Sequence, residues 1–378
     1  MSTIHWTESN APRSARWHSE NATPPPHRVI SADDRVKADT AYRQACEGTA
    51  LLWRGDFHHA RQLLRAMGRR IDRKPPGRGD GPAGSFHLHR RARSHRARVL
   101  GRLLVLLEAD HSLALRRTPD VRAACTEAYG PPSTPMAVSL TELLGVLGAH
   151  QWRRKGVWVP ALGAHIHPHY GVFSPVRGEY VDLVAQAPLP APAGRRAARR
   201  TVAFDVGTGT GVLAAVLARR GLDHVVATDI SPRALACAHE NMRRLRLTGR
   251  AEVVGPALFP DGRADLVVCN PPWVPARPCS EVERGVYDPG GAMLHGFLHG
   301  LAGHLEPGGE GWLVLSDLAE HLGLRTRREL LAVIESAGLR VVGRTDTTPR
   351  HPRAKDPSAP LHAARAAEVT SLWRLTGA

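Results

Sequence analysis

The strongest constraint on the fold is a glycine-rich segment, DVGTGTG, that occupies positions Asp205–Gly211. It begins at the end of the mostly apolar run 201–206, which is typical of a strand, and it leads into a helical pattern over 211–220. Glycine permits a tight turn and allows a ligand to come close to bare backbone. The segment therefore predicts an α/β fold with a ligand-binding edge at this strand–helix junction.

Several side chains and backbone groups near this junction are candidates for contacting a nucleoside cofactor. Those in the segment itself are Asp205, Gly207, Thr208, Gly209 and Gly211. A second acid, Asp229, ends the next expected strand, and a carboxylate there can accept hydrogen bonds from both ribose hydroxyls of an adenosine. The glycine spacing, G-x-G-x-G, differs from the G-x-G-x-x-G that is usual in nicotinamide enzymes.

Strands and helices alternate regularly over the rest of the C-terminal half, which predicts a parallel sheet with helices on both faces. The expected strands are 201–206, 224–228, 251–254, 264–269, 311–315, 340–344 and 369–375. The expected helices are 211–220, 232–245, 292–304 and 319–337.

The run Asn270-Pro271-Pro272-Trp273 ends the fourth of these strands. A planar NH2 group is a weak nucleophile, so its lone pair must be aimed at an activated carbon. The side-chain oxygen of Asn270 and the backbone carbonyl of Pro271 can accept its two hydrogens, the proline rings fix the backbone, and Trp273 offers a flat wall. Because parallel strands share one carboxyl edge, this run and the glycine-rich segment are expected to face one crevice.

Together, the glycine-rich segment and Asp229 form a pattern that resembles the cofactor-binding motifs of class I S-adenosylmethionine-dependent methyltransferases. The resemblance implies S-adenosylmethionine as cofactor and a Rossmann-like, seven-stranded, mostly parallel sheet. It adds Ile230, Leu258 and Phe259 as cofactor-binding candidates. Relatives often carry an acid where this chain has Ala257, so backbone and apolar groups would hold the adenine here.

Over about residues 155–375, the order of the motifs resembles that in release-factor glutamine methyltransferases (the HemK type) and in small-domain N-methyltransferases. Tyr170–Val184 resembles their connector, in which Arg177 and Glu179 are entrance residues or a surface ion pair. The resemblance implies a protein glutamine or another protein amide as methyl acceptor. The alternative methyl acceptor is an exocyclic amine of adenine or guanine in RNA or DNA. A third possibility for the function is an inactive methyltransferase-like binding module.

Composition along the chain predicts four regions. Residues 1–31 are expected to be disordered, and 32–150 to form a helical N-terminal domain with a flexible linker at 74–85. Residues 151–187 are expected to form a β-hairpin connector, and 195–378 the methyltransferase domain. The arginine-rich stretch 90–98 fits a nucleic-acid patch or the solvated side of a helix, and we favour the latter.

The chain has 378 residues and a formal net charge of +16, and all but four of its 51 basic residues are arginine. This excess suits an anionic partner, but a GC-rich genome would also enrich arginine. A protein acceptor, such as a translation factor, is favoured over nucleic acid, with no membrane span and a cytoplasmic location. Five scattered cysteines and the run His165, His167 and His169 lack the ligand count of a metal site, so no metal is expected.

Overall fold

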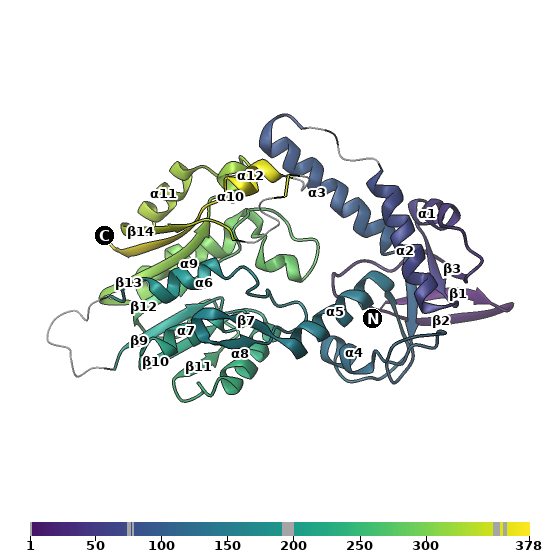
Figure 1. Ribbon diagram of the computed structural model, residues 1–378, viewed down its shortest axis with the longest axis horizontal. Coiled ribbons are helices and arrows are strands. Elements are labelled where there is room, and N and C mark those ends of the chain that lie inside the picture. Colours follow the sequence, from purple (N-terminus) through teal and green to yellow (C-terminus); the bar gives the residue numbers. More distant parts are fainter. Residues whose placement is uncertain (1, 74–76, 78, 191–199, 351–355, 358–360) are drawn as a thin grey trace. The chain divides into compact units, whose positions relative to one another are not determined.

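The computed structural model describes residues 2–73, 77, 79–190, 200–350, 356–357 and 361–378. These residues form two compact units (Figure 1). The first unit contains Met1–Asp80 and Gly84–Gln151, and the second contains Gly81–Ala83 and Trp152–Ala378. No helix of the described residues is long and apolar enough to span a bilayer.

The second unit is built on a seven-stranded sheet with the order β11-β10-β9-β12-β13-β15-β14. Its strands are β9 (Val202–Val206), β10 (His224–Thr228), β11 (Ala251–Val254), β12 (Ala264–Cys269), β13 (Leu305–Ser316), β14 (Leu339–Thr347) and β15 (Thr370–Gly377). Only β15 runs antiparallel to its neighbours, β13 and β14. The prediction of an α/β fold with a seven-stranded, mostly parallel sheet is therefore confirmed for this unit.

Helices cover both faces of this sheet, because alternate side chains of one strand enter different cores. Leu266 and Val268 of β12 pack in the core that contains α7, whereas Val267 and Cys269 pack in the core that contains α9. The helices of the unit are α6 (Glu179–Gln186), α7 (Val212–Arg219), α8 (Pro232–Arg244), α9 (Ala292–His304), α10 (Leu318–His321), α11 (Arg327–Ser336) and α12 (His362–Ala366).

The sequence predicted a hairpin near the start of this unit and one long helix near its end. The expected hairpin is present between β7 (Val157–Val159) and β8 (Ala164–Ile166), which pair antiparallel. The single helix expected over 319–337 is wrong, because α10 and α11 are separate. Thr326 begins α11 with a capping box in which its side chain and that of Glu329 each bond the other's backbone N–H, so a new helix starts there.

The first unit is also an α/β structure, so the prediction of a helical N-terminal domain is wrong. Its six-stranded sheet has the order β1-β2-β6-β5-β4-β3. The strands are β1 (Thr3–Glu8), β2 (Ala11–Trp17), β3 (Arg28–Ala32), β4 (Thr49–Trp53), β5 (Leu103–Leu107) and β6 (Met136–Ser139). The helices are α1 (Ala38–Cys46), α2 (Phe57–Asp72), α3 (Gly81–Leu100), α4 (Arg122–Tyr129) and α5 (Leu140–Lys155), whose last turn enters the second unit.

The expected disorder of residues 1–31 is contradicted by three strands in that range. β1 and β2 form an antiparallel hairpin, and β1 buries Ile4 and Trp6 on one side. Ser9 and Asn10 between the strands have φ angles of 50° and 58°. Two residues with positive φ form the tight connection that suits the twist of a hairpin, and asparagine tolerates this conformation well.

The missed strands β4 and β5 have a common cause. Their sequences, TALLW and LLVLL, are apolar almost throughout, and nearly every side chain is buried. A strand covered on both faces loses the polar–apolar alternation that identifies it and is then confused with a buried helix. The expected linker 74–85 lies partly outside the described residues, and its end, 81–85, begins α3.

Candidate functional site

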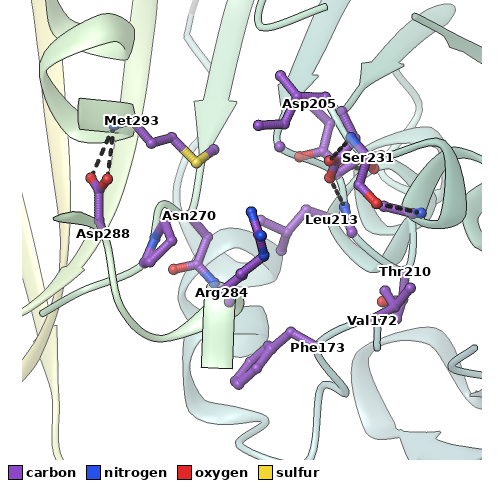
Figure 2. A pocket seen from close by; sticks show the side chains of 18 of the residues that line it. Val172, Phe173, Asp205, Thr210, Leu213, Ser231, Asn270, Arg284, Asp288 and Met293 are labelled. Atoms are coloured by element: carbon purple, nitrogen blue, oxygen red, sulfur yellow. Dashed lines mark hydrogen bonds between the residues drawn. The ribbon is translucent and has the colours of Figure 1, made fainter. Parts of the chain in front are cut away.

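A cavity of about 690 Å³ lies at the carboxyl ends of β9, β10, β11 and β12. The predicted site residues that line it are Asp205, Gly207, Thr208, Gly209, Asp229, Ile230, Leu258, Asn270 and Pro272. Figure 2 shows Asp205 and Ser231 on one side of the cavity and Asn270, Asp288 and Met293 on the other. The glycine-rich segment and Asn270 therefore face the same space.

Four predicted site residues, Gly211, Phe259, Pro271 and Trp273, do not line the cavity. Gly211 has a φ of +80°, and a Cβ added there would lie 2.8 Å from Cε of Met242, so it packs the loop against α8. The ring of Phe259 stacks on His304, with ring centroids 4.2 Å apart. These two residues pack against neighbouring side chains and do not face the cavity.

Asp205 is buried and holds the glycine-rich segment together. Its Oδ2 accepts a hydrogen bond from Oγ1 of Thr208 at 2.6 Å and another from the backbone N–H of Ala214 at 2.9 Å. Burial raises the pKa of Asp205 to about 6, against these hydrogen bonds, and the nearby carboxylate of Asp229 adds to the rise. Asp205 thus ties the end of β9 to the first turn of α7.

Asp229 fixes the neighbouring loop at the end of β10. Its two carboxylate oxygens accept hydrogen bonds from the backbone N–H groups of Gly209 and Ser231, at 3.0 and 2.9 Å. Burial raises the pKa of Asp229, and these bonds oppose the rise. The carbonyl of Asp229 also accepts the N–H of Ala257 at 3.2 Å, which brings the loop after β11 to the cavity.

The glycines of the loop differ in what surrounds them. Gly207 has a φ of +72°, and a Cβ there would lie 2.2 Å from Cε of Met293. Gly209 has a φ of +55°, and a Cβ there would meet no heavy atom within 4 Å. Because Gly209 also lines the cavity, its open side is where a ligand can approach the backbone.

Asn270 is held by an unexpected partner. The indole N–H of Trp273 donates a hydrogen bond to Oδ1 of Asn270 at 2.8 Å. This bond distinguishes the oxygen of the amide from its nitrogen and so fixes which way the amide faces. One lone pair of Oδ1 and the NH2 group of Asn270 are left to meet a ligand.

Trp273 is not the stacking wall that the sequence suggested. The guanidinium of Arg177 lies over its ring, 5.0 Å from the ring centroid. Arg177 also pairs with Glu179 at 2.7 Å and Glu368 at 3.1 Å, and both glutamates are buried. Arg177 and Glu179 therefore belong to a buried charge network behind the cavity rather than to a surface ion pair.

Two further residues shape the site. Asp288 is buried, and its carboxylate accepts the backbone N–H groups of Met293 and Leu294, which caps α9. Asn241 of α8 is fully buried; it accepts the N–H of His167 at 2.8 Å and donates to the carbonyl of Thr210 at 3.0 Å. Asp288 followed by a Pro-Gly-Gly turn carried a usable capping signal, whereas nothing local in the sequence marks Asn241.

Comparisons with known proteins bear on the second unit. Residues 164–335 match the family described as the methyltransferase small domain. The chain is 35% identical over 151 residues to a release factor glutamine methyltransferase of Cereibacter sphaeroides, which covers 36% of this chain and 51% of the relative. It is 49% identical over 69 residues to a ribosomal protein L11 methyltransferase of Pelotomaculum thermopropionicum, which covers 18% of this chain and 22% of the relative.

The chain thus spans about half the length of the first relative and about a fifth of the second. Among solved structures, a methyltransferase from Pyrococcus furiosus is 18% identical with a TM-score of 0.38, covering 63% of this chain and 99% of that chain.

The second unit is therefore a class I S-adenosylmethionine-dependent methyltransferase domain. Residues 164–335 match the methyltransferase small domain, and parts of the chain are similar to release factor glutamine methyltransferases and ribosomal protein L11 methyltransferases. The predicted resemblance and the predicted cofactor class are confirmed at this level.

The residues of the cavity fit S-adenosylmethionine. Asp229 places carboxylate oxygens at the end of β10, where ribose hydroxyls can donate to them. Ile230 beside it is 71% exposed and offers an apolar surface to an adenine ring. The open side of Gly209 admits the rest of the molecule. Ala257 lines the same cavity and carries no carboxylate.

Proposed function

We propose that this chain is an N-methyltransferase that moves a methyl group to a planar NH2 group held at Asn270, and that the acceptor is a protein glutamine or another primary amide. The placement of the Asn270 amide in the cavity, opposite the glycine-rich loop, carries the proposal. Relatives named for release factor glutamine and for ribosomal protein L11 support a protein acceptor.

The residues of this chain act by positioning. S-adenosylmethionine, when bound, supplies an electrophilic methyl on a sulfonium. Oδ1 of Asn270 accepts one hydrogen of the acceptor NH2, and the backbone carbonyl of Pro271 is proposed to accept the other. The nitrogen lone pair is then aimed along a single direction, and the same oxygens stabilise the positive charge that develops on nitrogen. The proton is released afterwards, so no strong general base is required.

The orientation of Asn270 suits an amide acceptor in a further way. Its Oδ1 accepts from the acceptor while its Nδ2 donates, so the two groups can pair head to tail with the C=O and NH2 of a primary amide. Trp273 does not line the cavity, and Arg177 covers one side of its ring. A large base therefore finds no stacking surface on Trp273, whereas a small amide needs none.

An exocyclic amine of adenine or guanine in RNA or DNA remains the second candidate. Adenine presents an NH2 group beside a ring nitrogen that accepts, which pairs with Asn270 in the same manner as an amide. The net charge of +16 favours an anionic acceptor. A module that binds the cofactor without transferring methyl is the third candidate, and intact Asn270 argues against it.

The deciding experiment incubates the full-length protein with cell extract and S-adenosylmethionine labelled in its methyl group. The labelled material is then digested with protease or with nuclease. We expect protease alone to release the label and mass spectrometry to find a methylated side-chain amide. Release by nuclease alone contradicts the protein-amide acceptor and supports the second candidate.

An Asn270→Ala variant tests the role of the amide in the same assay. We expect transfer to fall at least about a hundredfold, the scale seen when a preorganised polar contact to the transition state is removed. The affinity for S-adenosylhomocysteine should stay within about twofold, measured by isothermal titration. Unchanged transfer would contradict the proposed role of Asn270, and no binding of cofactor by the wild type would support the third candidate.

A further inference from the structure

Two helices of the first unit carry an unusual concentration of positive charge. α2 and α3 together contain nine arginines and five histidines but one acid, Asp72. Nine positive charges and one negative charge give these two helices a net charge of +8. This is half of the chain's net charge of +16, carried by about a tenth of its residues. The other half of the net charge is spread over the remaining residues, which hold 42 basic and 34 acidic side chains.

This concentration is not what a genome-wide arginine bias produces. Such a bias raises the arginine content of every exposed helix, but it does not remove the acids from two helices in particular. Taken alone, the 90–98 stretch fits the solvated face of a single helix. The structure adds a second arginine-rich helix beside it.

The two helices lie against each other. A Cβ added at Gly68 of α2 would lie 2.8 Å from Nη2 of Arg96 on α3, and Nε of Arg96 donates to Asp72 at 3.1 Å. Leu100 of α3 also reaches Gly68. Figure 1 shows α2 and α3 running as neighbours in this unit. The two arginine-rich helices are therefore direct neighbours.

We call the exposed arginines of these helices the arginine surface. They are Arg65, Arg69, Arg73, Arg91, Arg93, Arg96 and Arg98. The first three are spaced four residues apart and so share one side of α2 and its C-terminal cap. The only acid of the two helices, Asp72, is already bonded to Arg96.

Four of these side chains, Arg65, Arg69, Arg73 and Arg91, have no acidic partner among the residues that the structure describes. An exposed guanidinium offers two parallel N–H groups that match the oxygens of a phosphate. Four such groups on two neighbouring helices offer several contacts to a repeating polyanion.

The aromatic residues of the two helices indicate what part of a nucleic acid would be contacted. Phe57 and Phe86 are both buried, so neither offers a ring on which an unpaired base can stack. The exposed guanidinium groups offer paired N–H donors to phosphates. Two helices packed side by side also make a broad surface rather than one projecting helix. This suits the shape and phosphates of an RNA duplex better than the major groove of DNA.

We propose that the arginine surface binds the phosphate backbone of structured RNA. This site lies in the first unit and is independent of the methyl transfer proposed for the second. It predicts binding that depends steeply on salt and little on base sequence.

Fluorescence anisotropy of a labelled RNA hairpin with a stem of about 16 base pairs, titrated with the full-length protein, tests the proposal. The test variant is Arg65→Gln/Arg69→Gln/Arg73→Gln/Arg91→Gln, which removes four charges and keeps long helix-forming side chains. We expect its Kd for the hairpin to rise at least tenfold at 0.1 M salt. The slope of log K against log salt should shrink by about three, since each phosphate contact contributes about 0.7 to 0.9.

The matched control is Arg219→Gln/Arg243→Gln/Arg328→Gln, which removes exposed arginines of three helices in the methyltransferase domain. Its Kd should stay within about twofold of the wild type after correction for net charge. Circular dichroism establishes that both variants are folded. The proposal is overturned if the control weakens binding as much as the test variant, or if the test variant binds as the wild type does. Tighter binding of the DNA hairpin of the same sequence, or equal competition by polyglutamate, also overturns it.

Discussion

At the scale of single residues, Trp273 changes the account of the acceptor site. Its indole N–H bonds Oδ1 of Asn270, and Arg177 lies over its ring. A tyrosine or phenylalanine at this position would present no N–H at the same point. We therefore expect Trp273 to affect the acceptor through Asn270, by keeping the oxygen of that amide in one orientation.

A Trp273→Phe variant removes the N–H and keeps an aromatic ring. A hydrogen bond of this kind contributes about 1 to 1.5 kcal/mol, so we expect kcat to fall roughly tenfold. The affinity for S-adenosylhomocysteine should not change, because Trp273 does not line the cavity. Initial rates of methyl transfer and isothermal titration measure the two quantities. Trp158→Phe, at an exposed tryptophan of β7, is the control, and equal rates in both variants would contradict the role of Trp273.

Gly209 offers a second test at this scale, with Gly221 as its matched control. Both have positive φ, +55° and +95°, and a Cβ at either would meet no atom within 4 Å. Replacement by alanine should lower the free energy of unfolding by about 1 kcal/mol in each case, from backbone strain alone. Only Gly209 lines the cavity, so only Gly209→Ala should weaken S-adenosylhomocysteine binding, by tenfold or more. Equal affinities in the two variants would place the ligand elsewhere.

The sequence located the candidate site because its signals are local. The glycines, Asp229 and Asn270 each lie directly after a strand, and parallel strands bring such positions to one edge. Phe259 and Trp273 do not line the cavity, because a ring can face the cavity or the core and only long-range packing decides which. Asn241 went unrecognised since its partners, His167 and Thr210, are distant in sequence.

At the scale of elements, Glu240 joins α8 to the segments before the cavity. It accepts hydrogen bonds from His169 at 2.7 Å and from Arg244 at 2.8 Å, and it pairs with Arg153. Burial alone would raise the pKa of Glu240, but these bonds outweigh it and lower the pKa from 4.5 to about 2. The loop 171–173, which lines the cavity, begins two residues after His169.

The lowered pKa of Glu240 sets the pH range of its contribution. A carboxyl whose folded-state pKa is lowered stabilises the fold above its unfolded pKa and loses that contribution as pH falls towards its folded pKa. The Tm of Glu240→Gln should therefore lie below that of the wild type at pH 7, and the difference should shrink between about pH 4.5 and 2. Thermal unfolding at several pH values measures this. Glu335→Gln, which removes the same charge at an exposed position of α11, is the control, and a constant difference for Glu240→Gln would contradict the assignment.

Elements were predicted well where they alternate and poorly where they are buried on both sides. In the second unit β10, β11 and β12 begin and end where expected, because glycine, proline and acidic residues mark the strand ends. In the first unit β4 and β5 were taken for helix, since a central strand shows no alternation. The bond between Thr326 and Glu329 that starts α11 was also missed, although its two residues are visible in the sequence.

At the scale of the whole molecule, the two units divide the proposed functions. Every residue that lines the cavity lies between Gly171 and Met293, within the second unit. The arginine surface lies in the first unit. Binding of a nucleoside cofactor and binding of RNA are therefore expected to be separable by dividing the chain.

A fragment of residues 152–378 tests this separation. It contains the complete seven-stranded sheet and all cavity residues, so it should bind S-adenosylhomocysteine within about threefold of the full-length affinity. It should bind the RNA hairpin at least tenfold more weakly, because it lacks α2 and all of α3. Isothermal titration and anisotropy give the two affinities. Loss of cofactor binding in a folded fragment would show that the first unit contributes to the cavity, and unchanged RNA binding would contradict the division.

The position of β15 has a consequence for synthesis on the ribosome. β15 lies between β13 and β14, and β14 pairs with no other strand of the sheet. Since β15 is the last of these strands to leave the ribosome exit tunnel, β14 waits unpaired until then. The sheet that carries the cavity is therefore completed only after translation of residues 370–377, and a nascent chain that stalls earlier exposes the edges of β13 and β14 to other chains.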